Sequence, residues 1–289
     1  MQLNERAALN LSHVREKKPL IHNITNFVVM NYTANALLAM GASPVMAHSE
    51  DEVEEMVSFA GALVLNIGTL TIDWVNSMLK AGKMASKLNK PIILDPVGSG
   101  ATSLRTNSAK KIIKEVNLSV IRGNASEIIS LKDLDSKTKK HLSDLFQKQT
   151  DVISHQSLDS KTKGVDSIHS VDDASSIAKI IANEFETIVA ITGPTDFVTD
   201  GKDVILVSNG HPLMGCITGT GCTATAIIGA FLAVDKNPMT ATATALAFFG
   251  LAGEMASKKA EAPGSFMIEL INALYTITPE DLKKGCKIN

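Results

Sequence analysis

The chain has 289 residues, of which 45% are hydrophobic and 20% charged. This composition supports a sizeable buried core and excludes disorder over most of the chain. The 28 basic and 30 acidic side chains leave a formal net charge of −2, and neither sign forms a long block. We therefore expect a single domain over residues 1–289 that acts on a small molecule and binds neither nucleic acid nor a membrane surface.

Three cysteines stand at positions 216, 222 and 286. An odd number in a chain of this size indicates the reducing cytoplasm rather than a disulfide-bonded secreted protein. Residues 1–18 mix charged and apolar side chains and lack the apolar core of a signal peptide. The uncharged stretch 212–234 could cross a bilayer on length alone, but its first half is rich in Gly and Thr. We interpret this stretch as a loop followed by a buried helix.

Short apolar runs alternate with helical patterns through the first two thirds of the chain. Strands are predicted at 19–24, 44–47, 62–67, 91–94, 118–122 and 187–192. Helices are predicted at 26–40, ending at Gly41, at about 72–88, and from a capping box at 49–52 to about Phe59. Such alternation is typical of a parallel sheet covered by helices, in which ligands bind beyond the carboxyl ends of the strands.

The pattern changes after Thr192. Residues 196–209 predict an antiparallel hairpin, and Ala-rich helices are predicted at about 220–234, 238–258 and 263–275. The polar segment at about 132–170 contains the same six residues, LDSKTK, at 134–139 and 158–163. One match does not establish a repeat architecture, so we interpret this segment as a surface insertion.

The most informative string is GCITGTGCTATA at 215–226, a Gly/Thr-rich turn that leads into an Ala-rich helix. Glycines let backbone amides approach a ligand closely, and the free N–H groups of a helix N-terminus attract phosphate. Taken alone, the string fits a tight loop with glycines for packing equally well. It is not a Walker A loop, because no Gly-Lys-Ser/Thr follows, and it does not match G-x-G-x-x-G.

Further candidate residues stand at the ends of predicted strands. Asp95 and Arg122 each end an apolar strand, and Glu127 follows five residues after Arg122, so these charges can meet at one sheet edge. On local evidence alone, Asp95 could cap a turn, and Arg122 with Glu127 is more often a surface salt bridge. Thr192 could equally be a turn residue, and Met46 part of the core.

The seven histidines contribute little to the candidate chemistry. None shows the H-x-x-x-H or Cys-plus-His spacing that would hold zinc, so no zinc site is predicted. We expect His22, near the end of the first predicted strand, to make a structural hydrogen bond.

Together these motifs resemble a known family. A late Gly-Thr-Gly-X turn before a helix resembles the ribokinase-like kinases, in which X is usually the aspartate that takes the proton of the substrate alcohol. Here X is Cys222. With HNITN at 22–26, GASPVM at 41–46, LDPVG at 94–98 and RGNASE at 122–127, the chain resembles the hydroxyethylthiazole kinases of thiamine salvage. The polar segment is longer than this resemblance leads us to expect.

The resemblance implies a three-layer α/β fold with a central, mostly parallel sheet. It also implies phosphorylation of 4-methyl-5-(2-hydroxyethyl)thiazole by ATP with Mg²⁺, in a homotrimer whose neighbouring subunit completes the thiazole pocket. The site residues implied are Cys222 for catalysis; Met46, Gly219 and Asn26 for the thiazole; Arg122, Thr192, Thr220 and Gly221 for the nucleotide; and Asp95 and Glu127 for Mg²⁺, through water.

Cys222 can serve as a weak base in such a reaction. A loose phosphoryl-transfer transition state needs little early deprotonation of the alcohol. We expect the helix N-terminus to lower the pKa of Cys222 from roughly 8.5, so that a partial thiolate accepts the hydroxyl proton late. The amides of Gly219, Thr220 and Gly221 would hold the migrating phosphoryl group.

Other readings of the same residues stay open. An ATP- or ADP-dependent NAD(P)H-hydrate dehydratase, or another vitamin kinase, would share the fold. A covalent role for Cys222 would need a general base such as histidine within reach. A nucleotide-binding sensor without catalysis is the remaining alternative.

Overall fold

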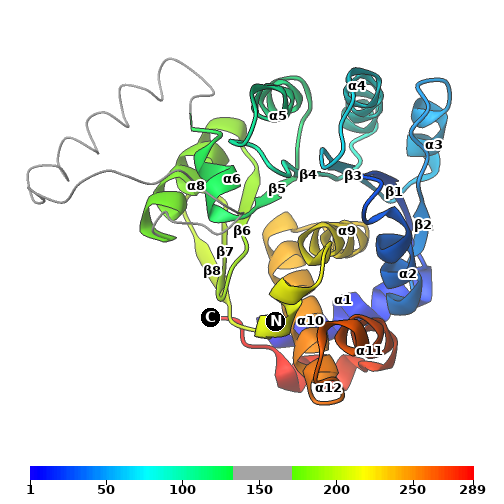
Figure 1. Ribbon diagram of the computed structural model, residues 1–289, viewed down its shortest axis with the longest axis vertical. Coiled ribbons are helices and arrows are strands. Elements are labelled where there is room, and N and C mark those ends of the chain that lie inside the picture. Colours follow the sequence, from blue (N-terminus) through cyan, green and yellow to red (C-terminus); the bar gives the residue numbers. More distant parts are fainter. Residues whose placement is uncertain (133–170) are drawn as a thin grey trace, which may run out of the picture.

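The computed structural model describes residues 1–132 and 171–289. The polar insertion expected at about 132–170 therefore lies, apart from its first residue, outside the described residues. Eight strands form one sheet in the order β2-β1-β3-β4-β5-β6-β7-β8 (Figure 1). The first six in the chain are parallel: β1 (Leu20–Ile24), β2 (Ser43–Val45), β3 (Ala62–Asn66), β4 (Ile92–Asp95), β5 (Val120–Gly123) and β6 (Ile188–Ile191). The antiparallel strands are β7 (Asp196–Thr199) and β8 (Val204–Val207).

Helices cover both faces of the sheet and give three layers (Figure 1). One face carries α3 (Val53–Phe59), α4 (Ile72–Lys87), α5 (Ser103–Glu115), α6 (Ala125–Ile129) and α8 (Val171–Phe185). The other face carries α1 (Leu3–Lys17), α2 (Met30–Met40), α9 (Thr220–Leu232), α10 (Pro238–Ser257), α11 (Pro263–Thr276) and α12 (Pro279–Gly285), with the short 3₁₀ helix η1 (Pro212–Cys216) before α9.

The central strands β3, β4 and β5 are apolar up to their carboxyl ends, because both of their faces are covered. Along β3, Ala62 and Val64 pack into the core under α9, whereas Leu63 and Leu65 pack into the core under α4. The alternation of side chains along a strand sends successive residues to opposite layers. Because both faces of the strand are covered, its sequence does not alternate between apolar and polar residues. This explains the pattern from which the parallel sheet was predicted.

The predicted strands, the hairpin and the three C-terminal helices are confirmed. The uncharged stretch 212–234 divides into η1 and the buried helix α9, as expected. Among the helices of residues 1–132 and 171–289, none combines the length and apolar character needed to span a bilayer. The sequence analysis did not identify α1, α5, α6, α8 or α12.

Two helix starts differ from the prediction. Helix α2 begins at Met30 rather than at residue 26. The capping box predicted at 49–52 is wrong, because α3 begins at Val53 without a side-chain cap and the Ser49 hydroxyl instead accepts a hydrogen bond from the amide of Asp51 (3.3 Å). A true capping box stands at the start of α6, where Asn124 and Glu127 each accept a hydrogen bond from the other's amide.

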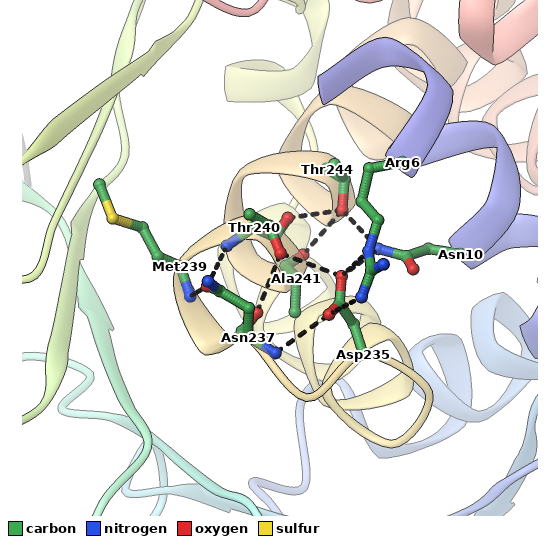
Figure 2. A network of polar contacts seen from close by, with 8 residues as sticks. All are labelled: Arg6, Asn10, Asp235, Asn237, Met239, Thr240, Ala241 and Thr244. Carbon is green, nitrogen blue, oxygen red and sulfur yellow. Dashed lines mark hydrogen bonds and ion pairs between the residues drawn. The ribbon is translucent and has the colours of Figure 1, made fainter. Parts of the chain in front are cut away.

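A buried polar network fixes α1 against the turn between α9 and α10 (Figure 2). The Asp235 carboxylate accepts hydrogen bonds from the Arg6 guanidinium (Nε to Oδ2, 2.7 Å), from Asn10 (2.8 Å) and from Thr240 (3.0 Å). Burial alone would raise the pKa of Asp235, but the bonds from Arg6, the Asn237 amide and Asn10 outweigh it and lower the pKa to about 2. The network therefore joins α1 to the turn between α9 and α10 through one ionised carboxylate.

Candidate active site

Polar side chains gather where β3, β4 and β5 end. Asp95 is the last residue of β4 and is fully buried. Its Oδ2 accepts hydrogen bonds from Thr225 of α9 (2.8 Å) and Asn66 of β3 (3.0 Å), and lies 3.4 Å from Arg122 Nη1. Burial raises the pKa of Asp95, and the positive charge of Arg122 opposes this only in part. Asp95 Oδ1 is buried and has no hydrogen-bond partner among the described residues.

Arg122 and Glu127 are both buried, and they do not form the surface salt bridge that was the alternative reading. Arg122 donates to the Thr192 hydroxyl as well as to Asp95. The two oxygens of Glu127 accept from the amides of Gly98 (2.8 Å) and Asn124 (2.8 Å). Arg122 is therefore oriented by β4 and by the residue after β6, while Glu127 holds together the turns that follow β4 and β5.

The turn before α9 depends on two glycines. Gly219 caps the helix with φ of 87°, and a Cβ there would lie 2.6 Å from Val29 Cγ1. At Gly221 a Cβ would lie 2.7 Å from Arg122 Nη1. The missing side chains let the helix start lie directly against α2 on one side and the guanidinium on the other. Free amides of the first turn and the charge of Arg122 thus come together, which is the arrangement that attracts phosphate.

Cys222, in the first turn of α9, is a thiol rather than a thiolate at neutral pH. Burial raises its pKa to about 11, and the negative charge of Asp95 adds to this, while the hydrogen bonds from Asn66 and Asn26 oppose it. The expectation that the helix N-terminus lowers this pKa is wrong, because burial and a neighbouring carboxylate outweigh the helix dipole. Cys222 Sγ lies 3.5 Å from Asn26 Nδ2.

A cavity of about 720 Å³ adjoins this turn. It is lined by all four predicted nucleotide residues, Arg122, Thr192, Thr220 and Gly221. Apolar side chains of η1 and α10, namely Met214, Leu246 and Phe249, line it as well. Phosphate-binding groups beside an apolar wall suit a nucleotide, whose base has flat aromatic faces and whose phosphates are charged.

The sequence analysis missed one charged residue of this cavity. Asp196, the first residue of β7, is buried, and its Oδ1 accepts a hydrogen bond from the Gly193 amide (3.0 Å). Burial raises the pKa of Asp196 to about 6. Its position three residues after Gly193, which follows the predicted strand 187–192, was the available signal, since Asp commonly closes such turns.

Of the residues predicted for the thiazole, Gly219 lies in the turn before α9, and Asn26 and Met46 follow strands at the carboxyl edge of the sheet. Asn26 follows β1, is buried, and donates to Asn66 Oδ1 (2.8 Å) as well as approaching Cys222. Met46 is half-buried and directly follows the edge strand β2. His22 makes the structural contact expected of it, with Nε2 2.8 Å from the carbonyl oxygen of Ala47.

The residues predicted for Mg²⁺ fit an ion held mainly by phosphate and water. Within residues 1–132 and 171–289, no three His, Cys, Asp or Glu side chains cluster as a metal site would require. The unpartnered Oδ1 of Asp95 is a suitable acceptor for a metal-bound water. Glu127 is committed to two amides, so it too would reach a metal through water.

A larger cavity of about 1030 Å³ lies at the opposite edge of the sheet, beside the first residues of β4, β5 and β6. It is lined by none of the predicted site residues. Ligands of open parallel sheets bind at the carboxyl edge, so the smaller cavity is the candidate active site.

Comparison with known proteins agrees with this geometry. A model of the hydroxyethylthiazole kinase family matches residues 11–153 and 148–280. The chain is 61% identical over 282 residues to a hydroxyethylthiazole kinase from Desulfotalea psychrophila, covering 98% of this chain and 94% of the relative. It is 48% identical over 279 residues to one from Pyrococcus furiosus, covering 96% of each chain.

Solved structures give the same result. The structure of hydroxyethylthiazole kinase from Pyrococcus horikoshii OT3 superposes with a TM-score of 0.82 at 43% identity, covering 99% of this chain and 98% of that one. A pyridoxal kinase from Staphylococcus aureus, 18% identical, shares the fold with a TM-score of 0.58 over 82% of this chain and 88% of that one. The chain has the ribokinase-like fold and belongs to the hydroxyethylthiazole kinase family.

Proposed function

We propose that this protein transfers the γ-phosphoryl group of ATP to the hydroxyl of 4-methyl-5-(2-hydroxyethyl)thiazole, giving the thiazole phosphate used to make thiamine. The observation that carries the proposal is the position of the turn from Gly219 to Cys222. On one side it adjoins Arg122 and the nucleotide cavity, and on the other it adjoins Asn26. A phosphoryl group held at this turn would lie between donor and acceptor.

The nucleotide is held by its phosphates in this proposal. Arg122 would bind phosphate oxygens, with Thr192 and Asp95 fixing its guanidinium. The amides of Gly219, Thr220 and Gly221 would surround the transferred group. The Thr220 side chain is already used, because its hydroxyl donates to the Met214 carbonyl (3.0 Å). Thr220 would therefore act through its amide.

Cys222 would orient the acceptor hydroxyl. The acceptor oxygen forms a bond to the γ-phosphorus while the bond from phosphorus to the departing ADP oxygen breaks. A thiol with a pKa of about 11 is a poor base at neutral pH. In a loose transition state the hydroxyl proton leaves late, and a phosphoryl oxygen can receive it. The role proposed for Cys222 is thus hydrogen bonding to the acceptor rather than early deprotonation.

Mg²⁺ bound to the ATP phosphates would neutralise charge that develops during transfer. Asp95 and Glu127 would support it through water, as the unpartnered Asp95 oxygen and the amide contacts of Glu127 suggest.

The surroundings of Cys222 favour phosphoryl transfer over covalent catalysis by this residue. Its side chain contacts the amide groups of Asn26 and Asn66, neither of which can act as a base. An activated cysteine nucleophile requires a lowered pKa or an adjacent base, and Cys222 has a raised pKa.

The family resemblance also supports a homotrimer built from a single domain over 1–289, working in the cytoplasm. Exposed apolar side chains on α2 and α11, Leu38, Ile268 and Tyr275, are compatible with a subunit interface. The three cysteines are free thiols, as the cytoplasm would keep them. Sedimentation velocity on the purified protein tests the trimer.

The activity is tested by coupling ADP release to NADH oxidation with Mg²⁺-ATP and three alcohols. Hydroxyethylthiazole should be turned over with a much higher kcat/KM than hydroxymethylpyrimidine or pyridoxal. A preference for either of the other two would overturn the substrate assignment, and nucleotide binding without turnover of any alcohol would indicate a sensor.

A further inference from the structure

Trp74 is the one tryptophan in the sequence, and it joins three elements at the carboxyl edge of the sheet. It lies in the first turn of α4, its side chain is buried, and its amide donates to the Thr71 hydroxyl that caps the helix (3.2 Å). The Phe27 ring meets it edge-on, with centroids 4.6 Å apart at 89°. The His48 ring stacks on it, with centroids also 4.6 Å apart and planes 13° from parallel.

The Phe27 contact fixes the segment that carries Asn26. Phe27 directly follows Asn26, and its amide donates to the Thr69 hydroxyl in the loop before α4 (3.1 Å). The side chain of Asn26 approaches Cys222 at 3.5 Å. The position of Asn26 beside the thiol therefore depends on how the Phe27 segment is attached to α4.

The His48 contact fixes the segment that carries Met46. His48 Nδ1 lies 3.4 Å from the carbonyl oxygen of Met46. Its ring stacks on Trp74, and Lys80 of the same helix donates to the Glu50 carbonyl (2.7 Å). Since β2 is a three-residue edge strand, these contacts with α4 hold the chain that leaves it.

Trp74 is the shared partner of two side chains that are otherwise exposed. Phe27 is 64% exposed, and His48 is also exposed. The nucleotide cavity is not lined by Phe27, His48 or Trp74. Losing the indole would therefore loosen both acceptor-side segments, which keep their hydrogen bonds to Asn66, Thr69 and His22, and leave the walls of the nucleotide cavity in place.

We infer that Trp74 is a positioning residue for the alcohol acceptor: through Phe27 and His48 it sets the places of Asn26 and Met46 relative to Cys222. This inference rests on the proposed function, because Asn26 and Met46 are the residues proposed to bind the thiazole. It predicts that Trp74 governs the KM for the alcohol and not the KM for ATP.

The test compares Trp74→Ala, Trp74→Phe and the wild-type full chain in the ADP-release assay. An aromatic pair is worth roughly twofold to tenfold in an equilibrium constant, and small displacements at a reacting centre are costly. Trp74→Ala should raise the KM for hydroxyethylthiazole about tenfold and change the KM for ATP less than about twofold. Trp74→Phe keeps the ring contacts and should restore most of the affinity. It also removes an indole N–H that is buried without a partner among the described residues.

Two further variants separate positioning from stability. Met78→Ala removes a fully buried side chain one turn later in α4 and should lower the melting temperature without altering either KM. His48→Ala removes an exposed ring, so it should fold normally and raise only the thiazole KM, about threefold, for the loss of one pair.

The inference is overturned if His48→Ala and Trp74→Ala leave the thiazole KM unchanged, if both KM values rise together, or if Met78→Ala reproduces the Trp74→Ala result. The wild-type assay distinguishes failure of the proposed function from failure of the positioning role of Trp74. If the wild type phosphorylates a different alcohol, the same ratio of acceptor KM to ATP KM is measured with that alcohol.

Discussion

The guanidinium of Arg122 lies directly over the backbone of Gly221, where a Cβ would stand 2.7 Å from Nη1 and 2.9 Å from Nη2. Moving the guanidinium aside would weaken its hydrogen bonds to Asp95 and Thr192. Residue 221 therefore controls how close the charge of Arg122 comes to the first amides of α9.

Gly221→Ala should consequently weaken ATP use. The added methyl group displaces the guanidinium, and we expect the KM for ATP to rise about tenfold, the cost of one weakened charge-assisted hydrogen bond. Steady-state kinetics with ATP as the varied substrate measures this. Gly264→Ala in the first turn of α11 is the matched control, because nothing lies within 4 Å of the added Cβ. An unchanged KM in Gly221→Ala would mean that Arg122 does not bind the nucleotide.

Arg122→Ala should weaken nucleotide binding much more than thiazole binding, because a guanidinium serves phosphate and has little to offer a neutral heterocycle. It should also destabilise the fold by about 3 kcal/mol, since the buried Asp95 carboxylate loses its positive partner. Calorimetry with a nonhydrolysable ATP analogue and urea unfolding measure the two effects. Arg122→Ala combined with Asp95→Asn should recover part of the stability and none of the nucleotide affinity.

Cys222 variants separate hydrogen bonding from base catalysis. With the pKa of Cys222 at about 11, a reaction that needs the thiolate would speed up tenfold per pH unit between pH 7 and 9. We expect a flat kcat over this range. Cys222→Ala should lower kcat by less than the roughly 10²- to 10⁴-fold lost with a general base, because the amides and Arg122 remain.

Cys222→Asp should stay active, because a carboxylate can also accept the hydroxyl hydrogen bond. Burial and the charge of Asp95 would raise the pKa of the new carboxyl, so kcat of this variant should fall as the pH is lowered through that pKa. Inactivity of the aspartate variant despite normal folding, together with an adduct on wild-type Cys222 in intact mass spectra, would indicate a covalent role instead.

Glu127→Gln tests the metal site. Glutamine can accept only one of the two hydrogen bonds that Glu127 receives from Gly98 and Asn124, and it lacks the charge. We expect a severalfold increase in the Mg²⁺ concentration needed for half-maximal rate at fixed ATP. The melting temperature should also fall, through the lost cap. Asn124→Ala breaks the same capping box without removing a carboxylate, so it should lower the melting temperature without changing the Mg²⁺ dependence.

The Asp235 network predicts a pH dependence of stability. The folded pKa of about 2 lies below the ordinary value of 3.8, so the contribution of Asp235 is complete above about pH 4 and is lost as the pH falls toward 2. Asp235→Asn should lower the free energy of unfolding by about 2 to 4 kcal/mol at pH 7, and by less at pH 3. Glu280→Gln, which breaks an exposed pair with Lys284, should change little at either pH.

The site could be located from the sequence because its charged residues stand at the ends of strands. Asp95 and Arg122 stand where apolar runs stop, and a parallel sheet brings such ends to one edge. The pKa of Cys222 could not be inferred in this way, because it is raised first by burial and then by the charge of Asp95. Both effects arise only when α9 packs on the sheet.

Local sequence patterns were also ambiguous where tertiary contacts decide which structure a segment adopts. Ser49 to Glu52 has the residues of a capping box but makes a turn, whereas Asn124 to Glu127 forms one in the site itself. Trp74 was interpreted only as part of a helix, because its partners Phe27 and His48 follow two other strands.

The anchoring of α1 has a consequence for how the protein is made. Asn10 bonds Thr244 across 234 positions, and Ala7, Leu11 and Val14 are buried in the core that α9, α10 and α11 complete. During translation α1 leaves the ribosome early, yet its packing surface arrives only with the last quarter of the chain. Until then its apolar side has no native surface to cover it, so a chain stopped before α10 would expose these residues to chaperones and proteases.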